Sequence, residues 1–169
     1  MSGTPIDEFQ ASLSDLDVTS SRTTADAFRG DIIDAIVKPA VGVRLPWPDV
    51  SLAETPINVE PTAGDLRTAK TGVTSVAFGI AEYGTLSIGS SPNGDEPVSL
   101  YPERHVAVVA ASDVVPDMNA AFARLSERFR DGDTSFVFET GPSATADMGA
   151  LVRGVHGPED VHVVVITDR

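Results

Sequence analysis

Two short segments of this chain are almost entirely apolar, and they narrow the folds that it can adopt. They are HVAVVAA at residues 105–111 and HVVVIT at residues 162–167. A strand with one face in water alternates apolar and polar residues, whereas an uninterrupted apolar run predicts a strand covered on both faces. Strands of that kind belong to parallel sheets that lie between helices. The two segments therefore predict an α/β domain.

Strands and helices alternate along the rest of the chain. The clearest helix is predicted at residues 117–130, where apolar residues recur every three or four positions and Arg128 and Arg130 occupy the last turn. The other predicted elements are helices at 23–38 and 143–152, strands at 41–45, 74–81, 84–89 and 134–139, and an irregular connection at 46–64 with one extended piece at 57–59. This order predicts a three-layer α/β/α fold with a largely parallel sheet, in which ligands usually bind beyond the carboxyl ends of the strands.

The length of the chain suits one domain. Its 169 residues predict a single domain over residues 1–169, with residues 1–22 as a loosely attached amino-terminal segment. The first ten residues have neither a basic region nor an apolar core, so no signal peptide is predicted. No apolar run approaches the roughly 20 residues that cross a bilayer. We therefore expect a soluble, cytoplasmic protein with no membrane partner.

The charge excess is acidic and is spread along the whole chain. The formal net charge is −13, with 16 Asp but only 2 Lys, and Arg supplies 10 of the 12 basic residues. Phosphate binding needs clustered Lys and Arg, so nucleic acid is not an expected partner. A lysine-poor, evenly acidic surface fits a cytoplasm at molar salt, where the Debye length falls to about 3 Å and self-repulsion is screened. An ordinary acidic protein at low salt is the alternative.

The chain contains no cysteine and three histidines. Disulfides, a thiolate nucleophile and an iron–sulfur cluster on the chain's own cysteines are therefore excluded. His105, His156 and His162 form no His-x-x-x-His or His-Glu pattern, so no metal site is predicted. We expect the chain alone to bind no metal or cofactor. His105 and His162 begin predicted strands and are interpreted as structural.

Three stretches carry residues that could do chemistry, and each has a plain structural alternative. The first is residues 79–97, where Glu82 follows a buried strand with Gly84 and Thr85 beside it. The Glu82 carboxylate could act as a base, a nucleophile or a hydroxyl anchor, or it could simply cap a backbone amide in a turn. The loop that follows could hold a ligand or be a flexible hairpin loop. Its small residues are Gly89, Ser90, Ser91 and Gly94.

The second stretch is TGPSATAD at residues 140–147, which leaves one predicted strand and enters the predicted helix 143–152. Ser143 or Thr145 could cap this helix, and the free amides of its first turn could bind a phosphate or carboxylate group. Asp147 would be a favourable acid in that first turn. Capping without any ligand is the alternative.

The third stretch is RGVHGPEDVH at residues 153–162, which leads into the last strand. Gly154 and Gly157 flank His156 in a loop. The imidazole could titrate near neutrality and act as an acid or a base. A loop histidine hydrogen-bonded to backbone is the alternative.

Taken together, these stretches resemble the LUD-domain family, which includes lactate utilization protein C. The resemblance rests on four segments in this order: GIAEYGTLSI, VSLYPERHVAVV, TGPSATAD and RGVHGPEDVHVVVI. It is close over about residues 65–169 and loose before them. The family's Glu-x-Gly-Thr motif falls on Glu82, Gly84 and Thr85, its second motif on Gly141, Pro142, Ser143 and Asp147, and its third on Gly154, His156, Gly157 and Pro158.

The resemblance implies a fold similar to that of the sugar-phosphate isomerase and coenzyme A transferase superfamily. It also implies a role beside two iron–sulfur partners in the oxidation of L-lactate to pyruvate. Three functions remain open, because fold does not determine function. They are an accessory subunit of lactate oxidation that binds a small anionic ligand, a free-standing enzyme that uses Glu82 on a phosphorylated or thioester substrate, and a non-catalytic regulatory module.

We expect the three stretches to converge on one pocket at the carboxyl edge of the sheet. Amides near Ser143 would hold an anionic group, Glu82 would hold or deprotonate a hydroxyl, and His156 would exchange a proton. A hydroxy acid or a phosphorylated sugar would suit such a pocket. The residues expected to bind the ligand are Gly84, Thr85, Gly141, Ser143, Thr145, Asp147, Gly154 and Gly157.

The acidic composition also yields a prediction about stability. Raising the concentration of potassium chloride from low to molar values should raise the melting temperature, because salt screens repulsion among the 25 acidic side chains. Thermal melts followed by circular dichroism would measure this. Equal melting temperatures at both salt concentrations would contradict adaptation to high salt.

Overall fold

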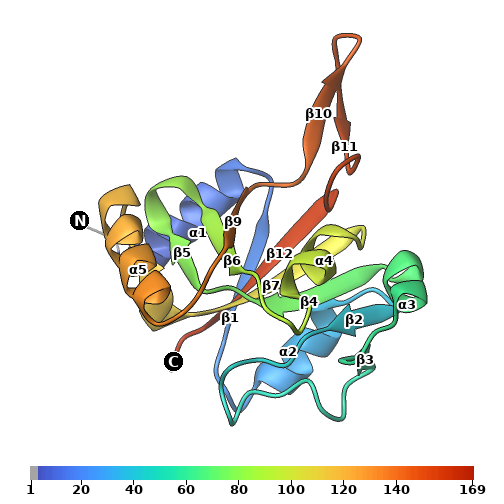
Figure 1. Cartoon of the computed structure of the whole chain (residues 1–169), viewed down its shortest axis with the longest axis horizontal. Helices are drawn as coiled ribbons and strands as arrows, with labels where there is room; N and C mark the ends of the chain where they lie inside the picture. Colours follow the sequence, from blue (N-terminus) through green and yellow to red (C-terminus); the bar gives the residue numbers. More distant parts are fainter. Residues whose placement is uncertain (1–3) are drawn as a thin grey trace.

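The computed structural model describes residues 4–169, and its centre is a six-stranded sheet in the order β1-β12-β7-β4-β2-β3 (Figure 1). All neighbouring strands in this sheet are parallel. The two apolar segments form β7 and β12. These strands pair with each other, and most of their residues are buried. The strands are β1 (Thr19–Thr23), β2 (Ala40–Gly42), β3 (Ile57–Asn58), β4 (Thr71–Ser75), β7 (Arg104–Ala110) and β12 (Asp160–Ile166).

A second sheet has four strands, in the order β8-β5-β6-β9, and continues from the carboxyl edge of the first. Here β5 directly follows β4, β8 follows β7 after a short turn, and β5 and β8 stay parallel, so two central strands continue past the carboxyl edge of the main sheet. The strand β6 is antiparallel to both β5 and β9. The elements are β5 (Phe78–Ile80), η1 (Ala81–Tyr83), β6 (Thr85–Gly89), η2 (Ala111–Asp113), β8 (Val114–Val115) and β9 (Phe136–Thr140).

Helices cover both faces of the main sheet, as the α/β prediction requires. The side chains of β7 alternate between two cores: Ala107 and Val109 pack with α1, and Val106 and Val108 pack with α2. The helices are α1 (Pro5–Asp15), α2 (Phe28–Ala35), α3 (Ala63–Thr68), α4 (Asp95–Leu100) and α5 (Met118–Arg130). Within residues 4–169, no helix is long and apolar enough to cross a membrane.

The amino-terminal residues are not loosely attached where the structure describes them. Thr4 and Asp7 form a capping box that starts α1, and Phe9 and Leu13 on this helix are fully buried. The ring of Phe9 lies against Gly79, where a Cβ atom would come within 2.8 Å of it. The strand β1 then forms an edge of the main sheet. The expected loose segment over residues 1–22 is therefore wrong for residues 5–22, because two large apolar side chains tie it to the core.

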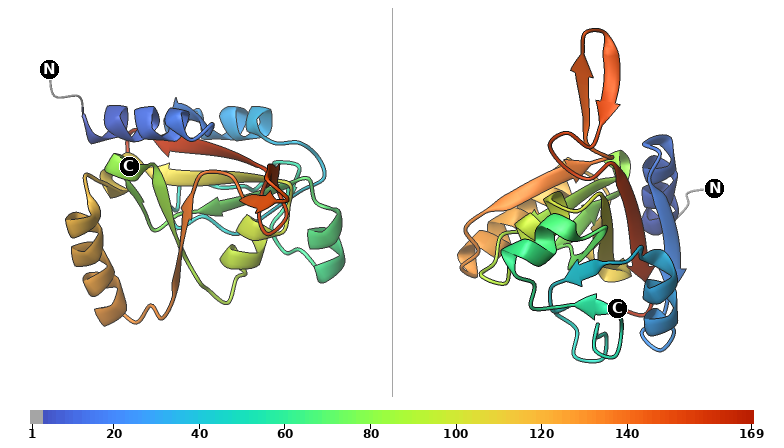
Figure 2. Two further views of the ribbon diagram at one scale, coloured as in Figure 1. Left: turned by 90° about the horizontal axis from the view of Figure 1, so that it is seen from above. Right: turned by 90° about the vertical axis from the view of Figure 1, so that its right-hand side faces the viewer.

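Two predicted helices also need correction. The helix expected at residues 23–38 begins only at Phe28, and Thr23 belongs to β1. The helix expected at 143–152 is a hairpin of β10 (Ala144–Asp147) and β11 (Ala150–Arg153). Met148 and Gly149 both have positive φ angles, 47° and 82°, and so form a two-residue turn that reverses the chain. This hairpin projects away from the body of the molecule (Figure 2).

The predicted helix 117–130 is confirmed as α5, but its apolar face is only partly covered. Ala121 is its one buried residue, whereas Phe122 and Phe129 are exposed. One aromatic contact joins this helix to the second sheet: the rings of Phe129 and Phe136 lie 5.4 Å apart between centroids.

The close approach of α4 to β4 gives a test of the fold. A Cβ atom on Gly72 would lie 1.9 Å from the Val98 carbonyl oxygen, so Gly72→Ala should force α4 away and lower the unfolding free energy by about 1–3 kcal/mol or more. Gly30→Ala is the matched control. Nothing lies within 4 Å of a Cβ at Gly30, and alanine favours a helix interior by about 0.5–1 kcal/mol. Urea denaturation would measure both changes, and equal stability of the two variants would contradict this packing.

Candidate functional site

A cleft of about 670 Å³ opens at the carboxyl edge of the main sheet, where ligands of α/β folds usually bind. Its floor comes from Ser75 at the end of β4, with Val76 and Ala77, and from Gly89 at the end of β6. The strands β2 and β7 also end at this edge, and the loops after them supply Trp47 and Asp113 to the cleft.

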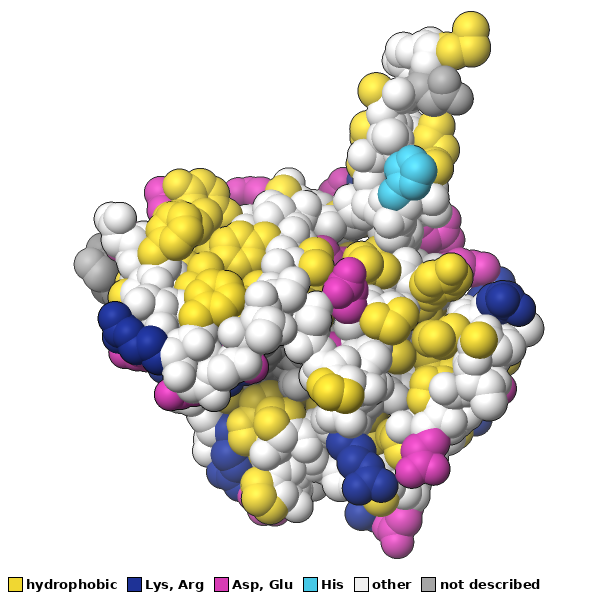
Figure 3. Space-filling view, viewed as in Figure 1, with side chains coloured by type: hydrophobic (Ala, Val, Ile, Leu, Met, Phe, Trp, Pro, Cys, Tyr) yellow, Lys and Arg dark blue, Asp and Glu magenta, His cyan; other side chains and the backbone are white. Residues whose placement is uncertain are grey.

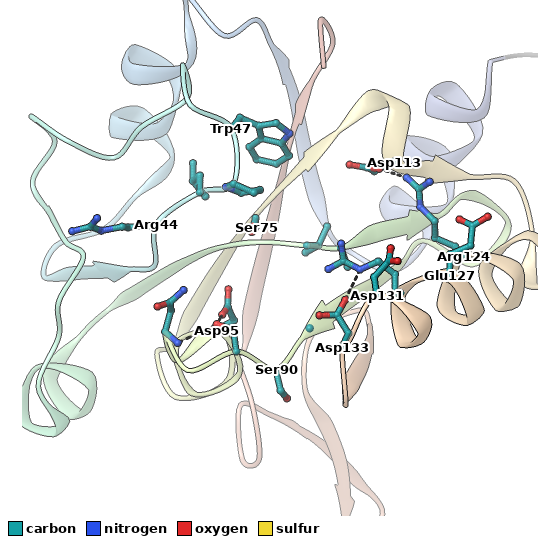
Figure 4. A pocket seen from close by; sticks show the side chains of 18 residues that line it. Arg44, Trp47, Ser75, Ser90, Asp95, Asp113, Arg124, Glu127, Asp131 and Asp133 are labelled. Carbon is teal, nitrogen blue, oxygen red and sulfur yellow. Dashed lines mark hydrogen bonds and ion pairs between the residues drawn. The ribbon is translucent and has the colours of Figure 1, made fainter.

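The two walls of the cleft differ in character (Figure 4). One wall is α5 with the residues that follow it. There Arg124 pairs with Asp113, and Arg128 Nε lies 2.7 Å from Asp133 Oδ2. Arg128 also lies over the Phe136 ring, 5.9 Å from its centroid. The opposite side carries the Trp47 indole, and Asp95 also lines the cleft, apart from Trp47. The cleft therefore offers guanidinium groups, carboxylates and one large aromatic ring.

The glycine–serine loop lies in this cleft. Gly89, Ser90 and Ser91 line it, while Gly94 caps α4 outside it. The loop is anchored to α4, because Ser90 Oγ donates a 2.7 Å hydrogen bond to Glu96 Oε2 and Ser91 Oγ bonds Asp95. A loop held in this way keeps its shape at the cleft.

Glu82 lies elsewhere, in η1. Its side chain is exposed and lines a separate pocket with Tyr83 and the start of α5. The Glu82 amide donates to the Pro116 carbonyl at 3.0 Å, which fixes the turn. The negative charge of Glu82 raises the pKa of Tyr83 above its usual 10. The other carboxylates among the described residues that line this pocket are Glu8 and Asp117.

The structure does bring the first and second motifs side by side. Both β5 and β9 run antiparallel to β6, so Glu82 and Gly141 leave the same edge of the second sheet. Thr85 Oγ1 lies 2.8 Å from Thr140 Oγ1 across the paired strands. At Gly84, whose φ is 63°, a Cβ atom would come within 3.0 Å of the α1 backbone. These residues therefore serve to join β6, β9 and the end of α1.

The second and third motifs meet at the foot of the hairpin. The Ser143 amide donates to the Pro158 carbonyl at 2.8 Å, and the Gly154 amide donates to the Ser143 carbonyl at 3.0 Å. The Ser143 amide is therefore already occupied. No helix starts at Ser143 either, so the expected anion site at a helix start is absent from this part of the described chain. Thr145 and the backbone of Asp147 lie in β10; the Asp147 side chain lies outside the described atoms.

His156 lines its own pocket of about 530 Å³ at this foot, together with Gly154, Gly157, Leu100 and Tyr101. A Cβ atom at Gly157 would lie 3.2 Å from Ser143 Cβ, so the third stretch does pack on the second. Glu82 does not line this pocket. The structure thus packs Ser143 against Gly157, next to His156 in the sequence, whereas Glu82 lines a different pocket.

A buried polar chain was not identified from the sequence. His105 Nδ1 lies 2.9 Å from Glu139 Oε2, and His105 Nε2 lies 2.9 Å from Thr74 Oγ1. A carboxylate only accepts, so in the neutral ring Nδ1 donates to Glu139 and Nε2 accepts from the Thr74 hydroxyl. His105 and Thr74 are fully buried, so these hydrogen bonds connect β4, β7 and β9 in the interior. The sequence signal was a lone Glu in the apolar strand TSFVFE.

The interpretation of His105 and His162 as structural agrees with these contacts. His162 Nδ1 lies 2.7 Å from Thr19 Oγ1, and its Nε2 lies 3.1 Å from Ser21 Oγ, so the ring joins β12 to β1. Among the described residues, no group of three or more His, Asp or Glu side chains is placed to hold a metal ion.

The sequence model of the LUD domain matches residues 23–166. This chain belongs to the LUD-domain family. Lactate utilization protein C of Bacillus licheniformis is 39% identical over 105 residues, which are 60% of this chain and 44% of that protein. The namesake in Bacillus velezensis is 32% identical over 130 residues, 73% of this chain and 54% of that protein. The LUD-domain chain thus spans about half the length of these relatives.

A solved structure supports the fold. The crystal structure of a DUF162 family protein from Deinococcus radiodurans superimposes with a TM-score of 0.74, covers 96% of each chain, and shares 20% sequence identity. At that identity the likeness shows the fold alone.

The His162 environment gives a prediction about acid stability. Burial, and then the positive charge of Arg104, lower the His162 pKa from its ordinary 6.5 to about 4. The unfolded chain therefore takes up this proton first, so stability should be lost as the pH falls from about 6.5 towards 4. His162→Asn should remove this part of the pH dependence in denaturation curves. The control His156→Asn should keep it, and a wild-type slope in His162→Asn would refute this role.

Proposed function

We propose that this LUD-domain protein is an accessory subunit of a lactate utilization system, and that it works in the cytoplasm beside iron–sulfur partner subunits. The relatives named lactate utilization protein C support this role, since two of them are 32–39% identical to the chain. The chain has no cysteine, so any cluster in the complex would use cysteines of the partners. In this proposal the chain holds no metal or cofactor of its own.

The cleft at the carboxyl edge is the proposed site of a small anionic ligand. Its position beyond β4 carries this assignment, together with the guanidinium groups on the α5 wall. A carboxylate ligand would replace Asp133 as the partner of Arg128, and charge-assisted hydrogen bonds of this kind are the strong ones. The hydroxyls of Ser75, Ser90 and Ser91 would meet the polar remainder of a hydroxy acid.

Trp47 gives the opposite wall an apolar surface. A ligand with one charged end and a short apolar part therefore fits between the two walls better than a fully polar one. L-lactate has this character, with a carboxylate, one hydroxyl and one methyl group.

Calorimetric titration with L-lactate tests the site. Arg128→Gln should weaken binding at least tenfold, since it removes a charged donor worth about 1.5–3 kcal/mol. Arg130→Gln is the matched control, because Arg130 lies on the same helix and outside the cleft. If His156→Gln weakened binding and Arg128→Gln did not, the ligand would belong to the pocket at the hairpin foot. Glucose 6-phosphate serves as the second probe for a phosphorylated ligand.

The partnership needs a separate experiment. The tagged full chain, purified under native conditions from its own host grown on lactate, should bring down proteins that contain iron and acid-labile sulfide. The chain expressed alone should be colourless and should not oxidise lactate. An iron-free complex, or lactate oxidation by the chain alone, would contradict the role of accessory subunit.

A further inference from the structure

The hairpin of β10 and β11, which we call the arm (residues 144–153), is separate from both larger sheets. Its two strands pair only with each other, and they stand clear of the body in two perpendicular views (Figures 1 and 2). A lone two-stranded hairpin is at best marginally stable in water. An arm that keeps this form therefore suggests a surface that contacts another molecule.

The side chains of the arm agree with that suggestion. Met148 at its tip is fully exposed, and Leu151 and Val152 are 70% and 39% exposed. Figure 3 shows apolar side chains along the arm and at its tip. Single exposed apolar residues are ordinary, but a projecting row of them usually marks an interaction site.

The turn of the arm adds an independent observation. Met148 adopts a φ of 47°, in a turn position that normally takes Asn, Asp or Gly. A large apolar side chain at such a position is sterically unfavourable, and here it is fully exposed at the turn of the hairpin.

The foot of the arm is firmly attached. Two backbone hydrogen bonds join Ser143 to Pro158 and to Gly154, and Arg153 pairs with Asp17 at 2.7 Å. The arm therefore leaves the body in a defined direction. Beside this foot lies the pocket of about 530 Å³ whose walls include Leu100, Tyr101 and Val155.

Charge limits where two acidic molecules can touch. The chain carries −13 overall, yet residues 141–157 contain one Asp and one Arg and so add no formal charge. The arm therefore brings no net charge to the pocket, whose lining residues include one acid, Glu96.

We propose that the arm of each molecule docks into this pocket, beside the foot of the arm, on a second copy of the chain. The exchange is reciprocal, about a two-fold axis. A specific stable interface needs about 800 Å² from each partner, and an arm of ten residues docked one way is small against this. In a reciprocal exchange each copy contributes both an arm and a pocket. Two arm–pocket contacts then form, and the buried area doubles. This inference does not depend on the lactate role.

The first experiment measures the molecular mass of the protein and of two variants in solution. Light scattering after gel filtration in molar potassium chloride should give twice the 17.7 kDa of the chain. Leu151→Asp should return the protein to a monomer with an unchanged circular dichroism spectrum, because Leu151 is exposed within each copy. Phe122→Asp is the control, an equally exposed apolar residue on α5, and it should remain a dimer.

The second experiment locates the arm. The chain has no cysteine, so single Cys variants label one place each. A mixture of Met148→Cys and Tyr101→Cys proteins should form mixed cross-links with a short bismaleimide, whereas Met148→Cys mixed with Phe122→Cys should not.

A monomer at all concentrations up to the solubility limit would overturn the proposal. So would a dimer that Phe122→Asp breaks and Leu151→Asp leaves intact, because the interface would then lie on α5. If the protein is a monomer and the arm is needed to bind an iron–sulfur partner, the arm docks on that partner and not on a second copy, which would also overturn the proposal.

Discussion

The parallel pairing of β7 with β12 is the contact on which the rest of this structure depends. The two strands stay in register from Arg104 opposite Asp160 to Ala110 opposite Ile166, and their side chains fill both large cores. Because both faces are apolar, each needs its own helix, and α1 and α2 cover opposite sides. Because β4 and β7 continue into the second sheet, the carboxyl edge is hollowed between α5 and the loop that carries Trp47.

The second sheet is held on the first by polar contacts that the apolar pattern does not show. The chain from Thr74 through His105 to Glu139 connects three strands, and an unsatisfied buried partner would cost about 1–3 kcal/mol. Only one Glu139 oxygen is used; the other, Oε1, is buried with no hydrogen-bond partner among the described residues. Since Glu139 lies one residue before the end of β9, these contacts also determine where the chain leaves towards the arm.

The local patterns in the sequence predicted the fold class, the two central strands, α5 and the loop at Ser90, because each depends on neighbouring residues alone. The arm was missed because Ser143 to Val152 contains small residues and a capping pattern that suit a helix, and only the positive φ angles at Met148 and Gly149 reverse it. The expected convergence assumed that Glu82 and Gly141 follow strands of one parallel sheet. They follow strands of the mixed second sheet, and long-range pairing of that kind leaves no mark within a short window.

The segments that carry the family resemblance do not line the cleft. The Glu-x-Gly-Thr segment forms a turn against α1, and the other two motifs build the arm and its foot. Residues that bind a ligand at the carboxyl edge would line the cleft, and none of the motif residues whose side chains are described does so. Ligand choice would then depend on residues outside the motifs, such as Trp47 and Arg128, while the motifs maintain the scaffold and the arm.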